Sequence, residues 1–302
     1  MAAQATRPEC RALFDFEIEF ANGGGVKGEG FRLDILEEGI SDEELADYVV
    51  RDMRLLMVKS VRILKKAVVE EPHKRAVAAA TRPEIVDLSH VVEDGLVTYR
   101  GLPPPVIRDH MSRAQSRALY APGTEFQIGR IEMVGNTGTY LDSPFHRYAD
   151  GRDLSELPLP SLAALEGVVI RTPAGLRAVS RTLLSGHELD GRAVLIHTGW
   201  DSRWGSDAYF DGHPFLTEDA AGYLVRCRAA LVGIDSLNVD DAADGRRPVH
   251  TALLGGGIPV VEHLTGLERL PTTGFRFFAV PVKVRGLGTF PVRAFAVLDR
   301  CH

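Results

Sequence analysis

The sequence predicts an α/β fold: a layered domain with a buried sheet over residues 83–302, preceded by a small α+β module and its linker over residues 1–80. Two observations carry this prediction. After residue 83, short and almost continuously apolar runs alternate with helix-like stretches, which is typical of layered α/β domains. Before residue 80, two runs of apolar–polar alternation flank a glycine-rich connection, which is typical of a hairpin.

The N-terminal module opens with residues 13–20, LFDFEIEF, whose apolar and acidic side chains alternate as in a half-buried strand. The connection ANGGGVKGEG and the run FRLDI complete the hairpin. A glycine-rich phosphate loop would follow a buried strand and open a helix, so Lys27 and its neighbouring glycines fit a hairpin better.

A helix, a third strand and a linker complete the module. Ser41 and Glu44 form a capping box at the start of the helix. One helical stripe comprises Leu45, Val49, Met53 and Leu56. Residues 60–69, SVRILKKAVV, form the strand, and residues 70–84 form a linker with prolines near both ends. Because this part contains no cluster of catalytic residue types, we expect a structural or oligomerisation module.

The layered domain begins with residues 84–92, EIVDLSHVV. Further strands are predicted at residues 166–172, 192–200, 230–237, 258–264 and 275–284. Residues 217–229, TEDAAGYLVRCRA, have the pattern of a helix. These runs are short enough for strands and are almost continuously apolar, which predicts a sheet covered on both sides.

Composition excludes several classes of partner. The net charge is −6, and no block of Lys and Arg stands out, so we expect neither nucleic acid nor a membrane as partner. The three cysteines form no CxxC pair, which favours a reduced, intracellular protein. The sequence shows no signal-peptide core and no run of 18 apolar residues, so we expect a cytoplasmic protein that acts on a small molecule.

Ionisable side chains follow several predicted strands, at positions where loops carry chemistry. Residues 135–146, GNTGTYLDSPFH, place Asn136, Tyr140, Asp142 and His146 close to two glycines and a proline. Two later segments add further candidates, namely His197, Trp200, His250 and Glu262. His263 points away from Glu262, since adjacent residues diverge on strands and helices, and we leave it outside the site.

Asp142, His146, His250 and Glu262 offer two carboxylates and two imidazoles, which suit Zn²⁺ or Mn²⁺. Such an ion lowers the pKa of bound water and polarises a carbonyl. The same side chains also suit acid–base chemistry without a metal. Spacing alone does not decide whether they converge, because 104 residues separate His146 from His250.

Residues 83–302 resemble the cyclase family of metal-dependent hydrolases, which includes bacterial kynurenine formamidase and isatin hydrolase. The family's hallmark is H-x-G-T-H-x-D-x-P-x-H, and this chain reads NTGTYLDSPFH over the same positions. The segments VDLSH, HTGW, GIDSLNVD, HTALLGGGIPVVEHL and PVKVRGLGTFPVRAFAVL also resemble the family, in the same order. The resemblance implies a layered α/β domain with a buried mixed sheet, and a homo-oligomer, either a dimer or a tetramer.

The resemblance also implies roles for individual residues. Asp142, His250 and Glu262 would be metal ligands, and His146 would act in acid–base catalysis. Asn136 and Tyr140, however, occupy the two positions where the family has metal-binding histidines. Asn is a poor ligand for zinc and Tyr binds well only as phenolate, so the ordinary dinuclear site is not expected.

Three outcomes remain open for this altered site. The enzyme could hydrolyse an amide, lactam or lactone, or close such a ring, by acid–base chemistry of His146 and Asp142 with or without one Zn or Mn ion. The site could instead be metal-free, with Tyr140 as the proton donor of a lyase, dehydratase or cyclase. Activity could also be lost and small-molecule binding retained. In either enzyme, Asn136 would orient a carbonyl, and Trp200 and His197 would contact the substrate.

Overall fold

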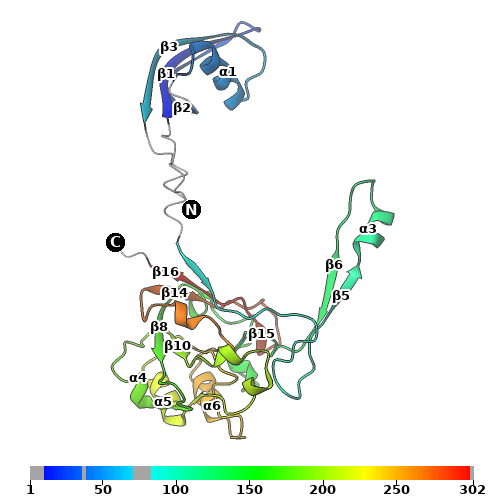
Figure 1. Cartoon of the computed structure of the whole chain (residues 1–302), viewed down its shortest axis with the longest axis vertical. Helices are drawn as coiled ribbons and strands as arrows, with labels where there is room; N and C mark the ends of the chain where they lie inside the picture. Colours follow the sequence, from blue (N-terminus) through cyan, green and yellow to red (C-terminus); the bar gives the residue numbers. More distant parts are fainter. Residues whose placement is uncertain (1–9, 36–38, 71–82, 300–302) are drawn as a thin grey trace, which may run out of the picture. The chain divides into compact units, whose positions relative to one another are not determined.

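The computed structural model describes residues 10–35, 39–70 and 83–299. The chain divides into two compact units, an N-terminal module of residues 1–82 and a C-terminal domain of residues 83–302 (Figure 1). Most of the expected linker, residues 71–82, lies outside the described residues, and so does Cys301.

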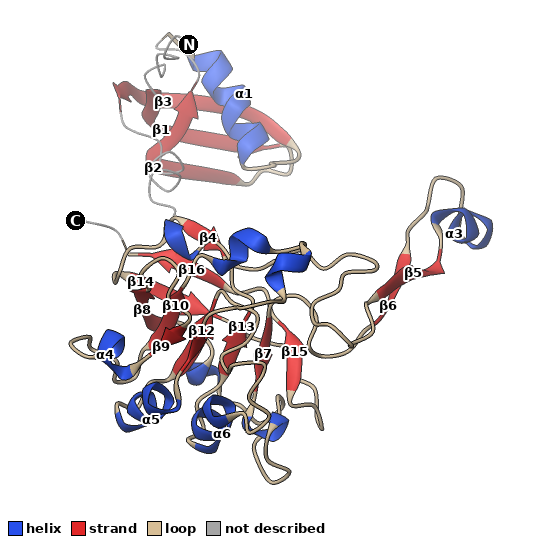
Figure 2. Cartoon of the chain, turned by 60° about the horizontal axis from the view of Figure 1, so that its bottom comes forward, coloured by secondary structure: helices blue, strands red, loops and turns tan. Residues whose placement is uncertain are grey.

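The N-terminal module is a three-stranded antiparallel sheet with one helix across a face (Figure 2). Its elements are β1 (Cys10–Phe20), β2 (Gly25–Ile35), α1 (Asp42–Asp52) and β3 (Val58–Glu70), and the strand order is β2-β1-β3. Alternate residues of β1 are buried beneath α1, which explains the alternation in the sequence. Ser41 and Glu44 form the expected capping box, with the Ser41 hydroxyl accepting from the Glu44 amide at 3.1 Å.

The expected helical stripe is wrong at its C-terminal end. Helix α1 ends at Asp52, and Met53 and Leu56 are 36% and 83% exposed. Arg54 and Met57 have positive φ angles of 49° and 60°, which turn the chain out of the helix. Only Leu45 and Val49 of the stripe are buried.

The C-terminal domain is built on one mixed sheet of nine strands, in the order β15-β7-β13-β12-β10-β8-β14-β16-β4. The four strands β13, β12, β10 and β8 are parallel, and antiparallel strands flank them on both sides. The strands of this sheet are β4 (Ile85–Asp87), β7 (Tyr140–Asp142), β8 (Leu165–Arg171), β10 (Ala193–His197), β12 (Leu231–Ile234), β13 (Val260–Glu262), β14 (Phe275–Phe278), β15 (Thr289–Pro291) and β16 (Phe295–Leu298).

Few helices accompany this sheet. They are α3 (Arg113–Leu119), α4 (Arg181–Leu184), α5 (Glu218–Arg226) and α6 (Pro248–Gly255). Short 3₁₀ helices are η1 (Pro144–His146), η2 (Leu159–Ser161), η3 (Trp200–Arg203), η4 (Asp207–Tyr209) and η5 (Leu267–Arg269). A small parallel pair joins β9 (Ala178–Val179) to β11 (Phe215–Leu216). In the parts of the chain that the structure describes, no helix combines the length and the apolarity needed to cross a membrane.

The sheet is buried on both faces, as its apolar runs predict. Along β10, Ala193 and Leu195 pack into one hydrophobic cluster, and Val194 and Ile196 pack into the other. Helices α5 and α6 cover the second cluster (Figure 2). The α/β fold with a buried mixed sheet is therefore confirmed.

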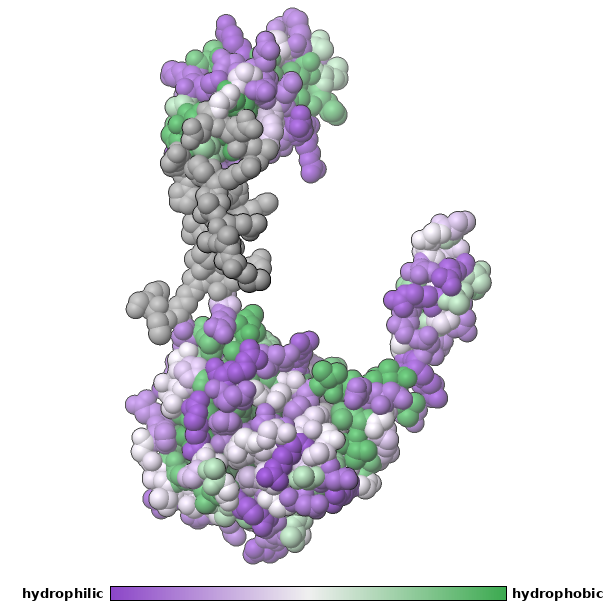
Figure 3. Space-filling model, viewed as in Figure 1, coloured by the Kyte–Doolittle hydropathy of each residue, from purple (hydrophilic) through white to green (hydrophobic). Residues whose placement is uncertain are grey.

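One feature was not expected: an arm of residues 106–132 that projects from the C-terminal domain (Figures 1 and 2). It consists of β5 (Val106–Met111), α3 and β6 (Ile128–Glu132), and β5 pairs only with β6 among the described strands. Almost every residue of the two strands is exposed. Apolar residues gather where the arm joins the domain (Figure 3).

Candidate active site

The candidate site lies where β7 joins the sheet. Strand β7 pairs with β13 on one side and with β15 on the other, which places Tyr140 opposite Glu262 and Asp142 opposite Thr289. His146 follows in η1, directly after β7, and His250 comes from α6. Strand pairing therefore brings together residues that lie far apart in the sequence.

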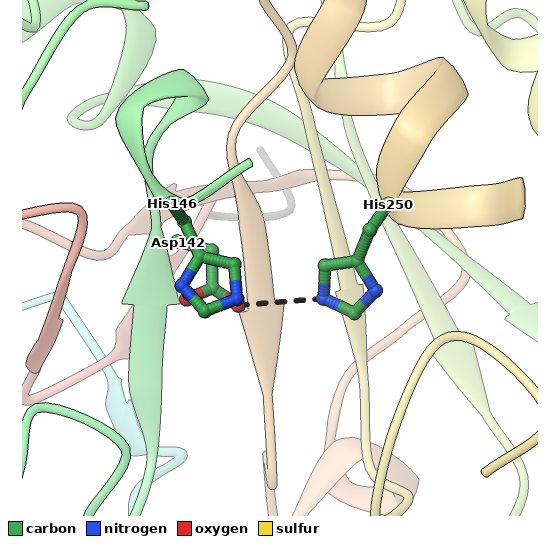
Figure 4. A group of neighbouring side chains, drawn as sticks. All are labelled: Asp142, His146 and His250. Carbon is green, nitrogen blue, oxygen red and sulfur yellow. Dashed lines mark ion pairs between the residues drawn. The ribbon is translucent and has the colours of Figure 1, made fainter. Parts of the chain in front are cut away.

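These residues share one cavity of about 390 Å³. Six residues singled out from the sequence line it: Asn136, Tyr140, Asp142, His146, His250 and Glu262. Figure 4 shows Asp142 and His146 approaching from β7 and η1 and His250 approaching from α6. The structure thus answers the question that spacing left open, since His146 and His250 converge on Asp142.

One carboxylate oxygen of Asp142 is buried and has no hydrogen-bond partner. This atom, Oδ2, lies 3.5 Å from Nε2 of His250. That same nitrogen lies 3.6 Å from Oε1 of Glu262. These distances are too long for good hydrogen bonds, but ligand atoms about 2.1 Å from a tetrahedral ion lie about 3.4 Å apart. The spacing of Nε2 of His250 from Asp142 and from Glu262 is therefore compatible with a shared divalent ion.

His146 is close enough to take part in such a site. Asp142, His146 and His250 offer donor atoms that all lie within 4.8 Å of one another. Oxygen and imidazole nitrogen are the donors that Zn²⁺ and Mn²⁺ accept.

Asp240 fixes the orientation of His250. Its Oδ2 atom lies 2.6 Å from Nδ1 of His250, and its carboxylate also accepts the backbone N–H groups of Val249 and His250 at the start of α6. A carboxylate on one ring nitrogen leaves the other directed at a ligand, as in many metal sites. Burial opposes the charge on His250, but the carboxylates of Asp142, Asp240 and Glu262 outweigh it and raise its pKa to about 10.

Thr289 connects Asp142 to His146. Its hydroxyl donates to Oδ1 of Asp142 and lies 2.7 Å from Nδ1 of His146. Because the hydroxyl proton is used on Asp142, its oxygen can accept the N–H of Nδ1, which leaves Nε2 of His146 as the basic nitrogen. His146 has a side chain that is 36% exposed, so this nitrogen can reach water and substrate.

Comparison with known proteins identifies the family of this chain. Residues 86–241, just over half of the chain, match the family model described as "Putative cyclase". The chain belongs to the cyclase family. This confirms the resemblance inferred from the motifs.

Named relatives share this cyclase-family domain. Kynurenine formamidase of Bacillus cereus is 24% identical over 212 residues, which cover 70% of this chain and 96% of that protein. Kynurenine formamidase of Geobacillus thermodenitrificans is 25% identical over 211 residues, which cover 69% and 95%. Because these relatives are hydrolases by name, the chain groups with the hydrolases of the cyclase family.

Solved structures show the same fold. Isatin hydrolase A from Labrenzia aggregata superposes with a TM-score of 0.63 at 21% identity, covering 75% of this chain and 98% of that one. A structure described as a potential metal-dependent hydrolase with cyclase activity gives a TM-score of 0.60 at 24% identity, covering 73% and 100%.

Tyr140 departs from the cyclase-family pattern in a defined way. Its hydroxyl donates to Oε2 of Glu262 at 2.6 Å. Burial and the nearby carboxylates of Glu262 and Asp142 raise the pKa of Tyr140 well above its usual value, so the phenol keeps its proton and does not become a phenolate ligand. Tyr140 therefore holds the carboxylate of Glu262 in place at the cavity.

The structure corrects two expected substrate contacts. Trp200 and His197 do not line the cavity. The Trp200 indole N–H donates to the carbonyl of Tyr209 at 2.9 Å, and Nε2 of His197 lies 4.0 Å from Asp235. His197 ends β10 and Trp200 follows it in η3, and β12 separates β10 from β13, which keeps both side chains away from the cavity. His263 is buried against Tyr209 and also lies outside the cavity, as expected.

Sequence reasoning missed several residues of the cyclase-family site. Thr289, Asp240 and Arg247 each contact or line it, but none belongs to a motif whose chemistry pointed to the cavity. The signal that could have found Asp240 is its place after the apolar strand of residues 230–237, in the stretch that leads to His250.

Proposed function

We propose that this chain is a hydrolase that cleaves the C–N or C–O bond of a small carbonyl compound, an amide, a lactam or a lactone, or closes such a ring in reverse. One Zn²⁺ or Mn²⁺ would be held by Asp142, His250 and Glu262. The observation that carries the proposal is the buried Oδ2 of Asp142, which has no hydrogen-bond partner and faces Nε2 of His250.

Each residue around the ion would have its own role in the reaction. A bound Zn²⁺ or Mn²⁺ supplies Lewis-acid polarisation of the carbonyl and a more acidic water. His146 takes a proton from the attacking water at Nε2 and returns it to the leaving nitrogen or oxygen. Thr289 and Asp142 hold the ring in the required tautomer. Tyr140 and the amide of Val239 hold the carboxylate of Glu262.

A second candidate is a metal-free lyase, dehydratase or cyclase. Its support is the pair of Tyr140 and Glu262, buried side by side at 2.6 Å. Burial raises the pKa of Glu262 to about 7, so the pair can hold a proton inside the cavity near neutral pH. Metal dependence of turnover distinguishes this candidate from the hydrolase.

Turnover in a His146→Ala variant tests the proposed chemistry. Aryl formamides, lactams and lactones are offered to the wild-type chain with Zn²⁺ or Mn²⁺, and kcat/KM is measured for every substrate that reacts. We expect His146→Ala to lower kcat/KM by roughly 10²–10⁴-fold, because it removes the acid–base group.

His187→Ala is the matched control, because His187 is exposed and lies outside the cavity. It should retain wild-type kcat/KM. Equal rates in the two variants would contradict the role of His146. Binding of these compounds without any turnover would instead favour a protein that has kept the cavity and lost the chemistry.

We also propose a homo-oligomer, a dimer or a tetramer, that uses the arm of residues 106–132. An isolated two-stranded ribbon is only marginally stable in water, yet this one exposes the cross-strand pair Ile107 and Ile131 at 42% and 48%.

Light scattering should give a multiple of 33.0 kDa for the wild type and a smaller mass for Ile107→Lys with Ile131→Glu. Arg108→Gln with Arg130→Gln, on the other face of the ribbon, is the control. An unchanged mass in the first variant would remove this role of the arm.

The place of action is part of the proposal. The three cysteines without a CxxC pair, together with bacterial relatives, support action in the cytoplasm. The structural or oligomerisation role of the N-terminal module stays a prediction.

A further inference from the structure

The cavity carries opposite charges at its two ends. Its acids, Asp142 and Glu262, are at most 1% exposed, which places them at the bottom. Three arginines also line it, and all are more accessible than these acids: Arg100, Arg147 and Arg247. The proposed metal site explains the acids, but nothing in that chemistry requires three cationic side chains at the rim.

Arg247 is the best positioned of these arginines. It is half-buried and lies directly before Pro248, the first residue of α6, with a positive φ of 52°. An Arg in this left-handed region costs about 1–2 kcal/mol, and such backbone outliers cluster at ligand sites. Its guanidinium donates to Oδ1 of Asn238 at 3.1 Å and to the hydroxyl of Tyr99 at 3.3 Å. Two neutral partners thus hold the guanidinium at the cavity.

Arg247 has no carboxylate in direct contact among the described residues, although Asp240 and Glu262 act on its charge from farther away. Among the described residues, no carboxylate forms an ion pair with Arg247, although the adjacent Arg246 pairs with Asp244 at 2.7 Å. Arg147 likewise contacts only neutral groups, Thr251 at 3.2 Å and the ring of Tyr148. Arg100 differs, because it pairs with Asp211 at 3.0 Å. Two rim guanidiniums therefore keep their charge available to a ligand.

We propose that the substrate is an anion, a small carbonyl compound that carries a carboxylate, and that Arg247 binds this carboxylate with help from Arg147. The proposal rests on the proposed hydrolase and names the class of its substrate. A guanidinium presents two parallel N–H donors that match a carboxylate, and a half-buried position strengthens this pairing. The paired donors of Arg247 hold the charged end of the substrate at the rim, and the reacting carbonyl then faces Asp142 and His146.

Binding of a matched pair of probes tests this inference without requiring turnover. Hippurate and its neutral amide, hippuramide, have the same shape and differ in charge. Dissociation constants are measured by calorimetry or ligand-observed NMR on the metal-loaded wild-type chain. We expect hippurate to bind at least about tenfold tighter than hippuramide, with a preference that weakens at high salt.

Substitutions of single arginines show which side chain causes the preference for hippurate. Arg247→Gln should reduce the preference for hippurate over hippuramide to less than about threefold. Arg247→Lys should retain part of this preference, because a lysine keeps the positive charge but lacks the two parallel N–H donors of a guanidinium. Arg246→Gln, on the same loop and already paired with Asp244, should leave it unchanged. If Arg247→Gln does not fold, Arg147→Gln at the exposed rim should still weaken hippurate selectively.

Two outcomes would overturn the inference: equal affinity of the wild type for both probes, or a preference that survives both Arg247→Gln and Arg147→Gln. The second result would mean that the carboxylate binds elsewhere, for instance at the ion. A wild type that hydrolyses none of the substrates but still prefers hippurate through Arg247 would contradict the proposed function and leave this inference standing. Failure of the inference and failure of the proposed function can therefore be told apart.

Discussion

Replacing both Asp142 and His250 with alanine is expected to abolish binding of the divalent ion and to lower turnover by about a thousandfold. Asp142 carries the buried oxygen that has no hydrogen-bond partner, and His250 faces it, so the double variant removes two of the three proposed ligands. The Lewis-acid contribution of such an ion is several kcal/mol, and each 1.4 kcal/mol corresponds to a tenfold change in rate. Elemental mass spectrometry of protein purified without a histidine tag or chelator measures the metal.

The wild type should contain about one Zn or Mn per chain. Asp241→Ala is the control, because Asp241 lies beside Asp240 but does not line the cavity. A wild type that holds no metal, even after incubation with Zn²⁺ and Mn²⁺, would contradict the hydrolase proposal. The metal-free pair of Tyr140 and Glu262 would then become the leading explanation, and the substrate search would turn to ring closure and dehydration.

Restoring the two family histidines, Asn136→His with Tyr140→His, is expected to raise the metal content from about one to about two ions per chain. Both positions already line the cavity, and burial and the nearby carboxylates raise the pKa of Tyr140, which disfavours the phenolate that a metal ligand requires. Neutral imidazoles at these positions would supply the missing nitrogen donors. Metal titration followed by elemental analysis measures the change.

Tyr140→Phe is the matched variant for this experiment. It removes the hydroxyl that donates to Glu262 without adding a ligand, so it should bind no additional ion. It should also lower the free energy of unfolding by about 1–3 kcal/mol, because a buried carboxylate loses a hydrogen bond. If the folded double histidine variant still binds a single ion, the two substitutions are not what limits the metal count.

Much of the fold could be predicted because its central strands are buried on both faces. The apolar runs at residues 166–172, 192–200 and 230–237 became β8, β10 and β12, the parallel centre of the sheet. The arm of residues 106–132 escaped prediction, since charged residues interrupt the alternation of both of its strands. Exposure on every side leaves a ribbon with no periodic signal in its sequence.

The candidate site could be predicted where ionisable residues stand at positions in the sequence that do not usually carry them. Asp142 and His146 share a loop with glycines and a proline, and His250 and Glu262 share a later segment. Thr289 is an ordinary residue type, and it reaches Asp142 only because β15 pairs with β7. Trp200 and His197 were expected at the substrate because their residue types suit binding. The strand order places them away from the cavity, which the sequence does not reveal.

The pairing of β15 with β7 has a consequence for protein synthesis. Thr289 lies 147 residues after Asp142 in the sequence. While β15 is still inside the ribosome, Asp142 therefore lacks the hydroxyl that joins it to His146. The candidate site can assemble only after β15 has left the ribosome, however early β7 and α6 fold.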